Sequence, residues 1–204
     1  LARYLASLHY MISHTPAHLT RARDAARSEG DENLAAHYQH KFDEEVEHHV
    51  WAENDLENLA QTGKTTAPAG VMPSAIKLAR AIEAAIDERP ALYLGYIAFV
   101  EYMTVMIGPE WMDLLAQNCG IPRTAVSVVD SHVDLDREHA EEGFSVMDDL
   151  VDDPALLPRM RESMKGFIAL FDAYSAEATL APAMPIPDES GTQPVAERVH
   201  AAVA

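Results

Sequence analysis

Apolar residues recur every three or four positions along almost the whole chain, and this spacing limits the possible folds more than any other feature of the sequence. Such spacing places apolar side chains on one face of an α-helix, whereas a half-buried β-strand would alternate apolar and polar residues. Alternation of that kind is hard to find here. The pattern therefore predicts an all-α fold, a compact bundle of six or seven helices.

Glycine and proline mark where these helices are expected to begin and end. Pro16 is expected to kink or break the first helix, and Gly108-Pro109 to interrupt a later one. A single helical domain is expected over residues 1–180, followed by a proline-rich tail over 181–204 that wraps the surface or stays disordered. The predicted helices span residues 3–28, 32–61, 73–87, 90–107, 111–117, 122–151 and 154–178.

The composition narrows the choice of partners and compartment. With 33 acidic and 15 basic residues, the chain has a net charge of −18 and is repelled by nucleic acids and anionic membranes, so neither is an expected partner. Cys119 is the only cysteine and cannot form an internal disulfide, which fits a reducing cytoplasm. The longest apolar run, 91–108, carries Glu101 near its middle and is barely long enough to span a bilayer. Because no signal peptide is recognisable at Leu1, a cytoplasmic protein is expected.

Ionisable residues on the apolar face of a helix are the most informative feature. In predicted helix 122–151, His132, Asp136 and His139 stand at i, i+4 and i+7, within about 60° of one another on the apolar face. A lone histidine there would more often be a partly exposed residue paired with a carboxylate. Three stacked polar residues instead favour metal binding, because a buried carboxylate is costly unless it is paired or bound to a cation. The apolar face comprises Ala125, Val129, Val133, Ala140, Met147 and Leu150.

Predicted helix 32–61 shows a similar feature. Glu45 lies near the centre of its apolar side and His48 follows at i+3, so the two side chains can reach one point. A Glu-x-x-His pair on an inward helix face is used by carboxylate-bridged diiron sites in helical bundles. The periodicity leaves open whether Glu44 replaces Glu45, or His49 replaces His48, in such a site.

Glu101 is the only formally charged residue within 91–108. Ionised and unpaired there it would be costly, so it either takes up a proton and hydrogen-bonds to a tyrosine or the backbone, or it binds a cation. A bound cation explains more of the sequence than a protonated Glu101 does, because the inward-facing histidines described above also need a binding partner. Glu45, Glu101 and Asp136 would bring three negative charges to two ferrous ions, leaving the site near +1, which suits a dry pocket.

Together these residues resemble the haem-oxygenase-like diiron oxidases and oxygenases, which share their architecture with haem oxygenase, thiaminase II and the oxidase that completes pyrroloquinoline quinone. The ligands of that superfamily are a Glu and a His on one core helix, a Glu on the next long helix, and a His-x3-Asp-x2-His run on a third. Here they correspond to Glu45-Val46-Glu47-His48, to Glu101, and to the run from His132 to His139, at intervals of 53 and 31 residues. The resemblance covers residues 3–177.

The resemblance implies a redox enzyme that uses iron and O2. Two Fe2+ ions would activate O2 as co-substrate, with Glu101 contacting both ions. The implied reaction is hydroxylation, desaturation, N-oxygenation or carbon–carbon cleavage of a small amine, amino acid or fatty acid, and a homodimer is compatible with such a bundle. The implied iron ligands are Glu45, His48, Glu101, His132, Asp136 and His139. Candidate substrate-pocket residues, which are of types that more often form plain core at helical spacing, are Tyr4, Met11, Trp51, Tyr93, Ile97 and Phe144.

Other functions remain open from the sequence. A thiaminase-II-like hydrolase needs a nucleophilic cysteine, yet Cys119 is far in sequence from the inward-facing acids. Haem oxygenase chemistry would use a histidine of the first helix, His14 or His18, and a cofactor-free oxidase would need no cluster of inward carboxylates. A non-catalytic binding protein with a relic metal site is a different class, which metal stoichiometry would distinguish.

Overall fold

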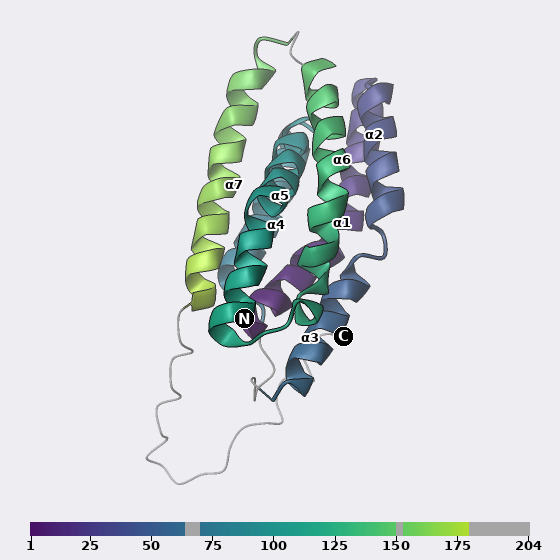
Figure 1. The fold of residues 1–204 in the computed structure, drawn as a ribbon. Coiled ribbons are helices and arrows are strands. Elements are labelled where there is room, and N and C mark those ends of the chain that lie inside the picture. Colours follow the sequence, from purple (N-terminus) through teal and green to yellow (C-terminus); the bar gives the residue numbers. More distant parts are fainter. Residues whose placement is uncertain (64–69, 150–152, 180–204) are drawn as a thin grey trace, which may run out of the picture.

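The computed structural model describes residues 1–63, 70–149 and 153–179, and within these ranges the chain forms seven α-helices and one 3-10 helix but no β-strand (Figure 1). The predicted all-α fold is confirmed. Leu150 and the predicted tail over 181–204 lie outside the described residues. The elements are α1 (Ala2–Glu29), α2 (Glu32–Glu45), α3 (His49–Gln61), α4 (Pro73–Glu88), α5 (Leu92–Cys119), η1 (Arg123–Ala125), α6 (Ser127–Asp149) and α7 (Leu156–Thr179).

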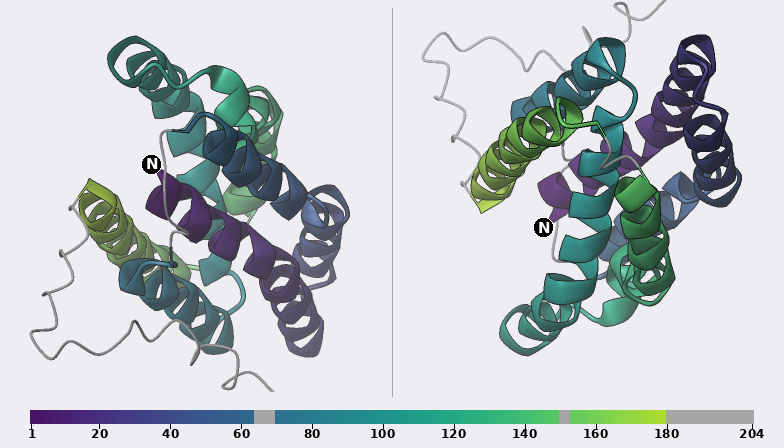
Figure 2. Two further views of the ribbon diagram at one scale, coloured as in Figure 1. Left: turned by 90° about the horizontal axis from the view of Figure 1, so that it is seen from below. Right: turned by 90° about the horizontal axis from the view of Figure 1, so that it is seen from above.

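The helices form a bundle in which α5 packs against α4, α6 and α7, while α1 packs against α2, α3 and α4 (Figures 1 and 2). Two tyrosines tie distant helices together. The hydroxyl of Tyr38 on α2 donates to the Pro90 carbonyl just before α5, over 2.6 Å, and that of Tyr174 on α7 donates to the Tyr4 carbonyl on α1, over 2.9 Å. The first of these bonds anchors α2 to the start of α5, and both helices contribute to the site described below.

α1 continues through Pro16, so of the predicted kink or break the break does not occur. The predicted interruption at Gly108-Pro109 is wrong, because α5 continues through it and 90–107 and 111–117 belong to one helix. Proline has no backbone N–H, so the carbonyl four residues before it loses its hydrogen-bond partner within the helix. Both prolines lie on half-buried faces, where water can bond that carbonyl instead. Gly108 serves helix packing, because a Cβ there would lie 2.7 Å from Cγ2 of Val133 on α6. Because Gly108 has no side chain, α6 can approach α5 closely. This close approach keeps Glu101 of α5 against α6.

The predicted helix 32–61 is divided, which the sequence analysis did not predict. α2 ends at Glu45, and the chain changes direction before α3 begins at His49 (Figure 1). In the connecting turn the backbone N–H of His48 donates to the Glu45 carbonyl over 3.2 Å, and that of Trp51 to the His48 carbonyl over 3.1 Å. These i to i+3 bonds belong to the tighter 3-10 winding. No glycine or proline lies in the turn, so local sequence offers no breaker.

α5 is long and apolar enough to cross a membrane by length and composition alone, with a mean hydropathy of 1.3 over its most apolar window. Core helices of globular proteins meet the same criterion, and 44% of that window is buried within the bundle. α5 also packs against three other helices and carries the buried Glu101. These features are those of a helix at the centre of a protein core.

Candidate metal centre

Glu45, His48 and His132 form a first group, although they belong to different elements. Glu45 ends α2, His48 lies in the turn before α3, and His132 lies near the start of α6. Glu45 Oε2 is 2.9 Å from His48 Nδ1 and 3.8 Å from His132 Nε2, and the three candidate ligand atoms lie within 4.8 Å of one another. Two atoms that each lie about 2.1 Å from one ion are about 3–4 Å apart, so this spacing suits a single metal ion.

The tight turn between α2 and α3 explains why Glu45 and His48 reach one point. In 3-10 winding, three residues make one turn, so side chains at i and i+3 are eclipsed. The helix break that the sequence analysis missed is therefore the local feature that aligns the predicted pair. The two alternatives, Glu44 and His49, do not enter this group.

Backbone and aromatic contacts orient the two imidazoles of this first group. His132 Nδ1 lies 2.6 Å from the Val128 carbonyl oxygen. Because a carbonyl only accepts, Nδ1 donates to it, and Nε2 is the ring nitrogen that faces Glu45 and is placed to bind a metal ion. The indole of Trp51 stacks on His48 with ring centroids 4.1 Å apart, and it meets His132 edge-on at 5.7 Å. Trp51, a candidate pocket residue from sequence, thus forms one wall of the first group.

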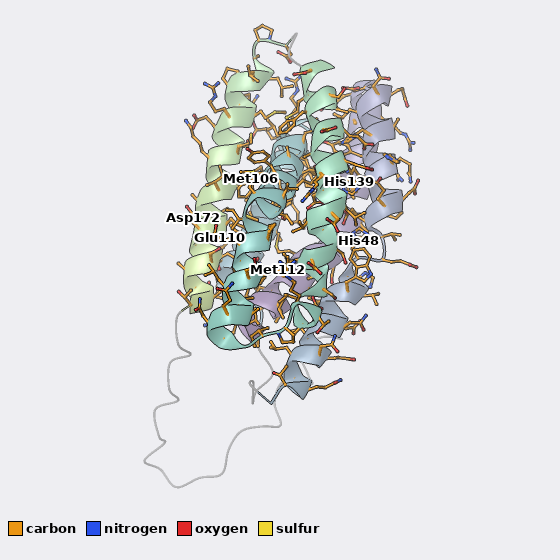
Figure 3. The ribbon with its side chains drawn as sticks, viewed as in Figure 1. His48, Met106, Glu110, Met112, His139 and Asp172 are labelled. Carbon is orange, nitrogen blue, oxygen red and sulfur yellow. The ribbon has the colours of Figure 1, made fainter. Side chains whose placement is uncertain are left out.

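Glu101, Asp136 and His139 form a second group, and all three are buried. His139 Nδ1 lies 3.4 Å from Asp136 Oδ1 and 4.0 Å from Glu101 Oε1. Because Asp136 follows His132 by one helical turn, the two groups are neighbours along one face of α6. Figure 3 shows His139 on α6 and His48 at the α2–α3 junction on the same side of the bundle. The structure thus brings the six predicted residues together as two adjacent groups of three.

Two further charged residues of α2 reach the second group. Lys41 is only 1% exposed, and its Nζ lies 3.1 Å from Glu101 Oε1. Glu44 Oε2 lies 3.4 Å from Lys41 Nζ and 3.5 Å from His139 Nε2, so Glu44 orients that imidazole from the side opposite Asp136. The sequence analysis missed Lys41 and weighed Glu44 only as a replacement for Glu45. Lys41 precedes Glu45 by four residues, so a search of the same helix face for basic residues would have found it.

Several buried polar atoms of this centre have no hydrogen-bond partner within the described part of the chain. They are Lys41 Nζ, Glu44 Oε2, Glu101 Oε2 and His139 Nδ1. Buried polar groups are nearly always satisfied by protein, water or an ion. The ammonium of Lys41 cannot bind a metal ion, but the unpartnered carboxylate oxygens and the imidazole nitrogen fit bound metal ions.

The two groups differ in electrostatics. Burial raises the pKa of Glu101 to about 7, and the nearby ammonium of Lys41 opposes this rise only in part. Burial alone would also raise the pKa of Glu45, but the imidazoles of His132 and His48 outweigh it and hold that pKa well below its usual range. Without metal, the first group therefore contains an ionised carboxylate, and the second contains a carboxyl group that titrates near neutral pH.

We expect the free energy of unfolding of the metal-free protein to be greatest near pH 6 and to fall by about 1–3 kcal/mol toward pH 8.5. It also falls on the acid side, because burial lowers the pKa of His18 and His37 to about 4, and the stability that these neutral imidazoles contribute is lost as the pH drops from 6.5 through about 4. The raised pKa of Glu101 contributes stability while the group is protonated, and this is lost as the pH rises from 4.5 through about 7. Burial would lower the pKa of His132, but Glu45 more than offsets it, and contact with Asp136 raises the pKa of His139. Both histidines stabilise fully below pH 6.5 and lose this contribution as the pH rises through their folded pKa values. Glu45 affects the pH dependence of stability only at acidic pH, because its stabilising contribution is complete above pH 4.5 and is lost as the pH falls below that value.

Urea unfolding in the presence of a chelator, from pH 5 to pH 8.5, measures this profile. Glu101→Gln removes the carboxyl group that titrates near pH 7, so it should reduce the decline between about pH 6 and pH 7.5. A free energy of unfolding that increases steadily from pH 5.5 to pH 8.5 in the parent chain would contradict the assignment.

The remaining candidate pocket residues lie in other surroundings. Phe144 is 46% exposed and its ring faces that of the exposed Tyr102, with centroids 6.3 Å apart, so the structure does not bring it to the centre. Tyr93 is buried and its ring lies against those of Tyr38 and Tyr96, with centroids 5.8 and 6.0 Å apart. The main hydrophobic core and its margin contain Tyr4, Met11, Tyr93 and Ile97.

The fold and the site define a class of protein, a helical bundle whose interior carries two neighbouring carboxylate–imidazole groups suited to metal ions. The sequence matches the model of the iron-containing redox enzymes over residues 5–172, and the chain belongs to that family. A crystal structure of a domain of unknown function with a haem-oxygenase-like fold, from Shewanella denitrificans OS217, is similar with a TM-score of 0.67 and 16% identity, over 87% of this chain and 78% of that one. At that identity, the likeness shows the fold alone. Among curated proteins, none matches this sequence.

Proposed function

We propose that this chain is a non-haem diiron oxidase or oxygenase that uses O2 to oxidise a small amine, amino-acid or fatty-acid-like molecule. The observation that carries the proposal is the pair of adjacent groups along α6, completed by Glu101 from α5 and by Glu45 and His48 from the α2–α3 junction. The first group has two imidazoles and one carboxylate, the ligand set of many non-haem iron oxygenases. Membership of the iron-containing family supports iron as the metal.

The chain's own residues have distinct roles in this proposal. The six side chains would hold two iron ions and leave coordination positions for O2 and substrate. Bound Fe(II) would supply the redox chemistry by which O2 is activated. Trp51 covers the first group and limits the access of water. Gly143 leaves space beside Glu101, because a Cβ there would lie 3.7 Å from Glu101 Oε2.

The alternatives on the same fold explain less. Cys119 is exposed at the end of α5, about five helical turns from Glu101, which does not suit a thiaminase-like nucleophile beside inward carboxylates. His14 and His18 of α1, which haem chemistry would use, leave the two groups unexplained, and burial lowers the pKa of His18 to about 4. A cofactor-free oxidase leaves the unpartnered acids without a role. We retain a small-molecule substrate, a cytoplasmic location and a possible homodimer as predictions.

Anaerobic loading of the metal-free full chain with Fe(II), followed by desalting, metal analysis and exposure to oxygen, tests the proposal. We expect about two iron ions per chain and an absorbance change that requires oxygen. Loading with Zn(II) is the control, because zinc occupies similar ligands but has no redox chemistry. Iron that binds without any response to oxygen would instead indicate a binding protein with a relic site. Failure to bind iron specifically would refute the metal centre itself.

A further inference from the structure

Lys41 is a buried lysine in the wall of the candidate metal centre. It is 1% exposed, and its Nζ has no partner with hydrogen-bond geometry among the described residues. Its two charged neighbours are Glu101, at 3.1 Å, and Glu44, at 3.4 Å. Lysine is almost never fully buried unless it is paired, and both carboxylates that pair with Lys41 lie at the second group.

The ammonium of Lys41 distinguishes the two groups. It lies against Glu101 of the second group, which has two carboxylates and one imidazole. In the first group, Glu45 forms its ion pairs with the imidazoles of His48 and His132, and no lysine or arginine of the described ranges pairs with it. Among the described residues, a lysine ammonium is therefore supplied to the second group and not to the first.

We propose that the Lys41 ammonium competes with metal at the second group, so that the two metal ions bind in order, the first group before the second. This inference rests on the proposed metal centre. Lys41 Nζ and a metal ion on Glu101 would both place positive charge beside one buried carboxylate, and two like charges at such a distance repel strongly in a protein interior. Metal binding at the second group therefore requires the ammonium to withdraw from Glu101.

Glu44 is the group that receives the withdrawn ammonium. It lies on the same helix as Lys41, three positions further on, and is already 3.4 Å from Nζ. Its Oε2 also lies 3.5 Å from His139 Nε2, on the side of the ring away from the Nδ1 atom that faces Asp136. A small shift of Lys41 toward Glu44 thus leaves His139 oriented for the metal, and the charges of Lys41 and Glu44 then cancel.

Titration of the metal-free full chain with Co2+, followed by its visible absorption and by calorimetry, tests this order without any turnover. In the parent chain we expect two equivalents, the second with a dissociation constant at least ~10-fold larger, which corresponds to about 1.4 kcal/mol. Lys41→Met keeps the length of the side chain and removes its charge, so it should tighten the second step by at least ~10-fold and change the first by less than ~2-fold. Lys165→Met is the control, because Lys165 is exposed on α7 and pairs with Glu162; it should bind Co2+ as the parent does.

An unchanged or weaker second step in Lys41→Met would overturn the inference, and so would two equal constants in the parent chain. Neither result would affect the proposed function, because each of the two results can be observed only if two metal ions bind. If instead the parent chain binds no Co2+, the proposed metal centre fails together with this inference. Circular dichroism of the metal-free variants checks their folding, and Lys41→Gln is judged by the same criterion if Lys41→Met does not fold.

Discussion

Replacing His132 with alanine is expected to remove the iron bound by the first group and to abolish the oxygen-dependent absorbance, while the metal-free protein still folds. The imidazole is one of three ligand atoms in the first group, and its tautomer is set by the Val128 carbonyl. Loss of a residue that merely orients a ligand already costs about 10–100-fold in metal affinity, so loss of a ligand should cost at least ~100-fold. Iron analysis after anaerobic loading, together with the optical response to oxygen, measures both effects.

A matched set of histidine variants separates the two groups. His139→Ala removes a ligand of the second group alone, so about one iron per chain should remain, still without an oxygen response because both ions are required. His49→Ala is the control, since His49 adjoins His48 in sequence but does not belong to either group. It should keep the parent's iron content and oxygen response. Full iron content in His132→Ala, or loss of iron in His49→Ala, would show that the ligands are assigned incorrectly.

Four of the six residues could be predicted from sequence because each stands out within its own helix, whereas periodicity did not separate Glu45 and His48 from Glu44 and His49. Glu101 interrupts an apolar run, and His132, Asp136 and His139 lie on an otherwise apolar face, so burial of a polar group is visible without knowledge of the fold. Periodicity does not show which residues meet across helices. The division into two groups therefore came only from the structure.

The features that the sequence analysis missed depend on tertiary contacts. The turn between α2 and α3 contains no glycine or proline. It is held by backbone hydrogen bonds and by the contact of Glu45 with His132 of α6, which is distant in sequence. Gly108-Pro109 has the composition of a helix breaker, yet the tight contact between α5 and Val133 of α6 gives the glycine a packing role. Lys41 was missed because a lysine beside acidic residues usually lies on a solvated surface, and only its neighbours show that it is buried.

Asp55→Ala is expected to cause a loss of about 2–4 kcal/mol in the free energy of unfolding, because it leaves buried hydrogen-bond donors of α6 without partners. Asp55 lies on α3 and is fully buried. Its Oδ1 accepts bonds from the Ser127 backbone N–H at 2.8 Å and the Ser127 hydroxyl at 2.6 Å, and its Oδ2 accepts from the Val128 N–H at 2.8 Å. These N–H groups open α6 and have no partner within that helix, and the carboxylate also lies at the positive end of the helix dipole.

Asp31→Ala is the matched control, since Asp31 caps α2 with a single bond from Leu34 N–H over 3.0 Å and is only half-buried. It should cost about 1 kcal/mol in urea unfolding, whereas Asp55→Asn, which keeps one acceptor oxygen, should fall between the two alanine variants. Asp55 also joins α3, which follows His48 directly, to the start of α6, which carries His132 five residues further on. Its loss should therefore weaken iron binding at the first group even under conditions where the protein remains folded. If Asp55→Ala destabilises no more than Asp31→Ala and leaves iron binding unchanged, Asp55 does not hold α6 in place for the metal centre.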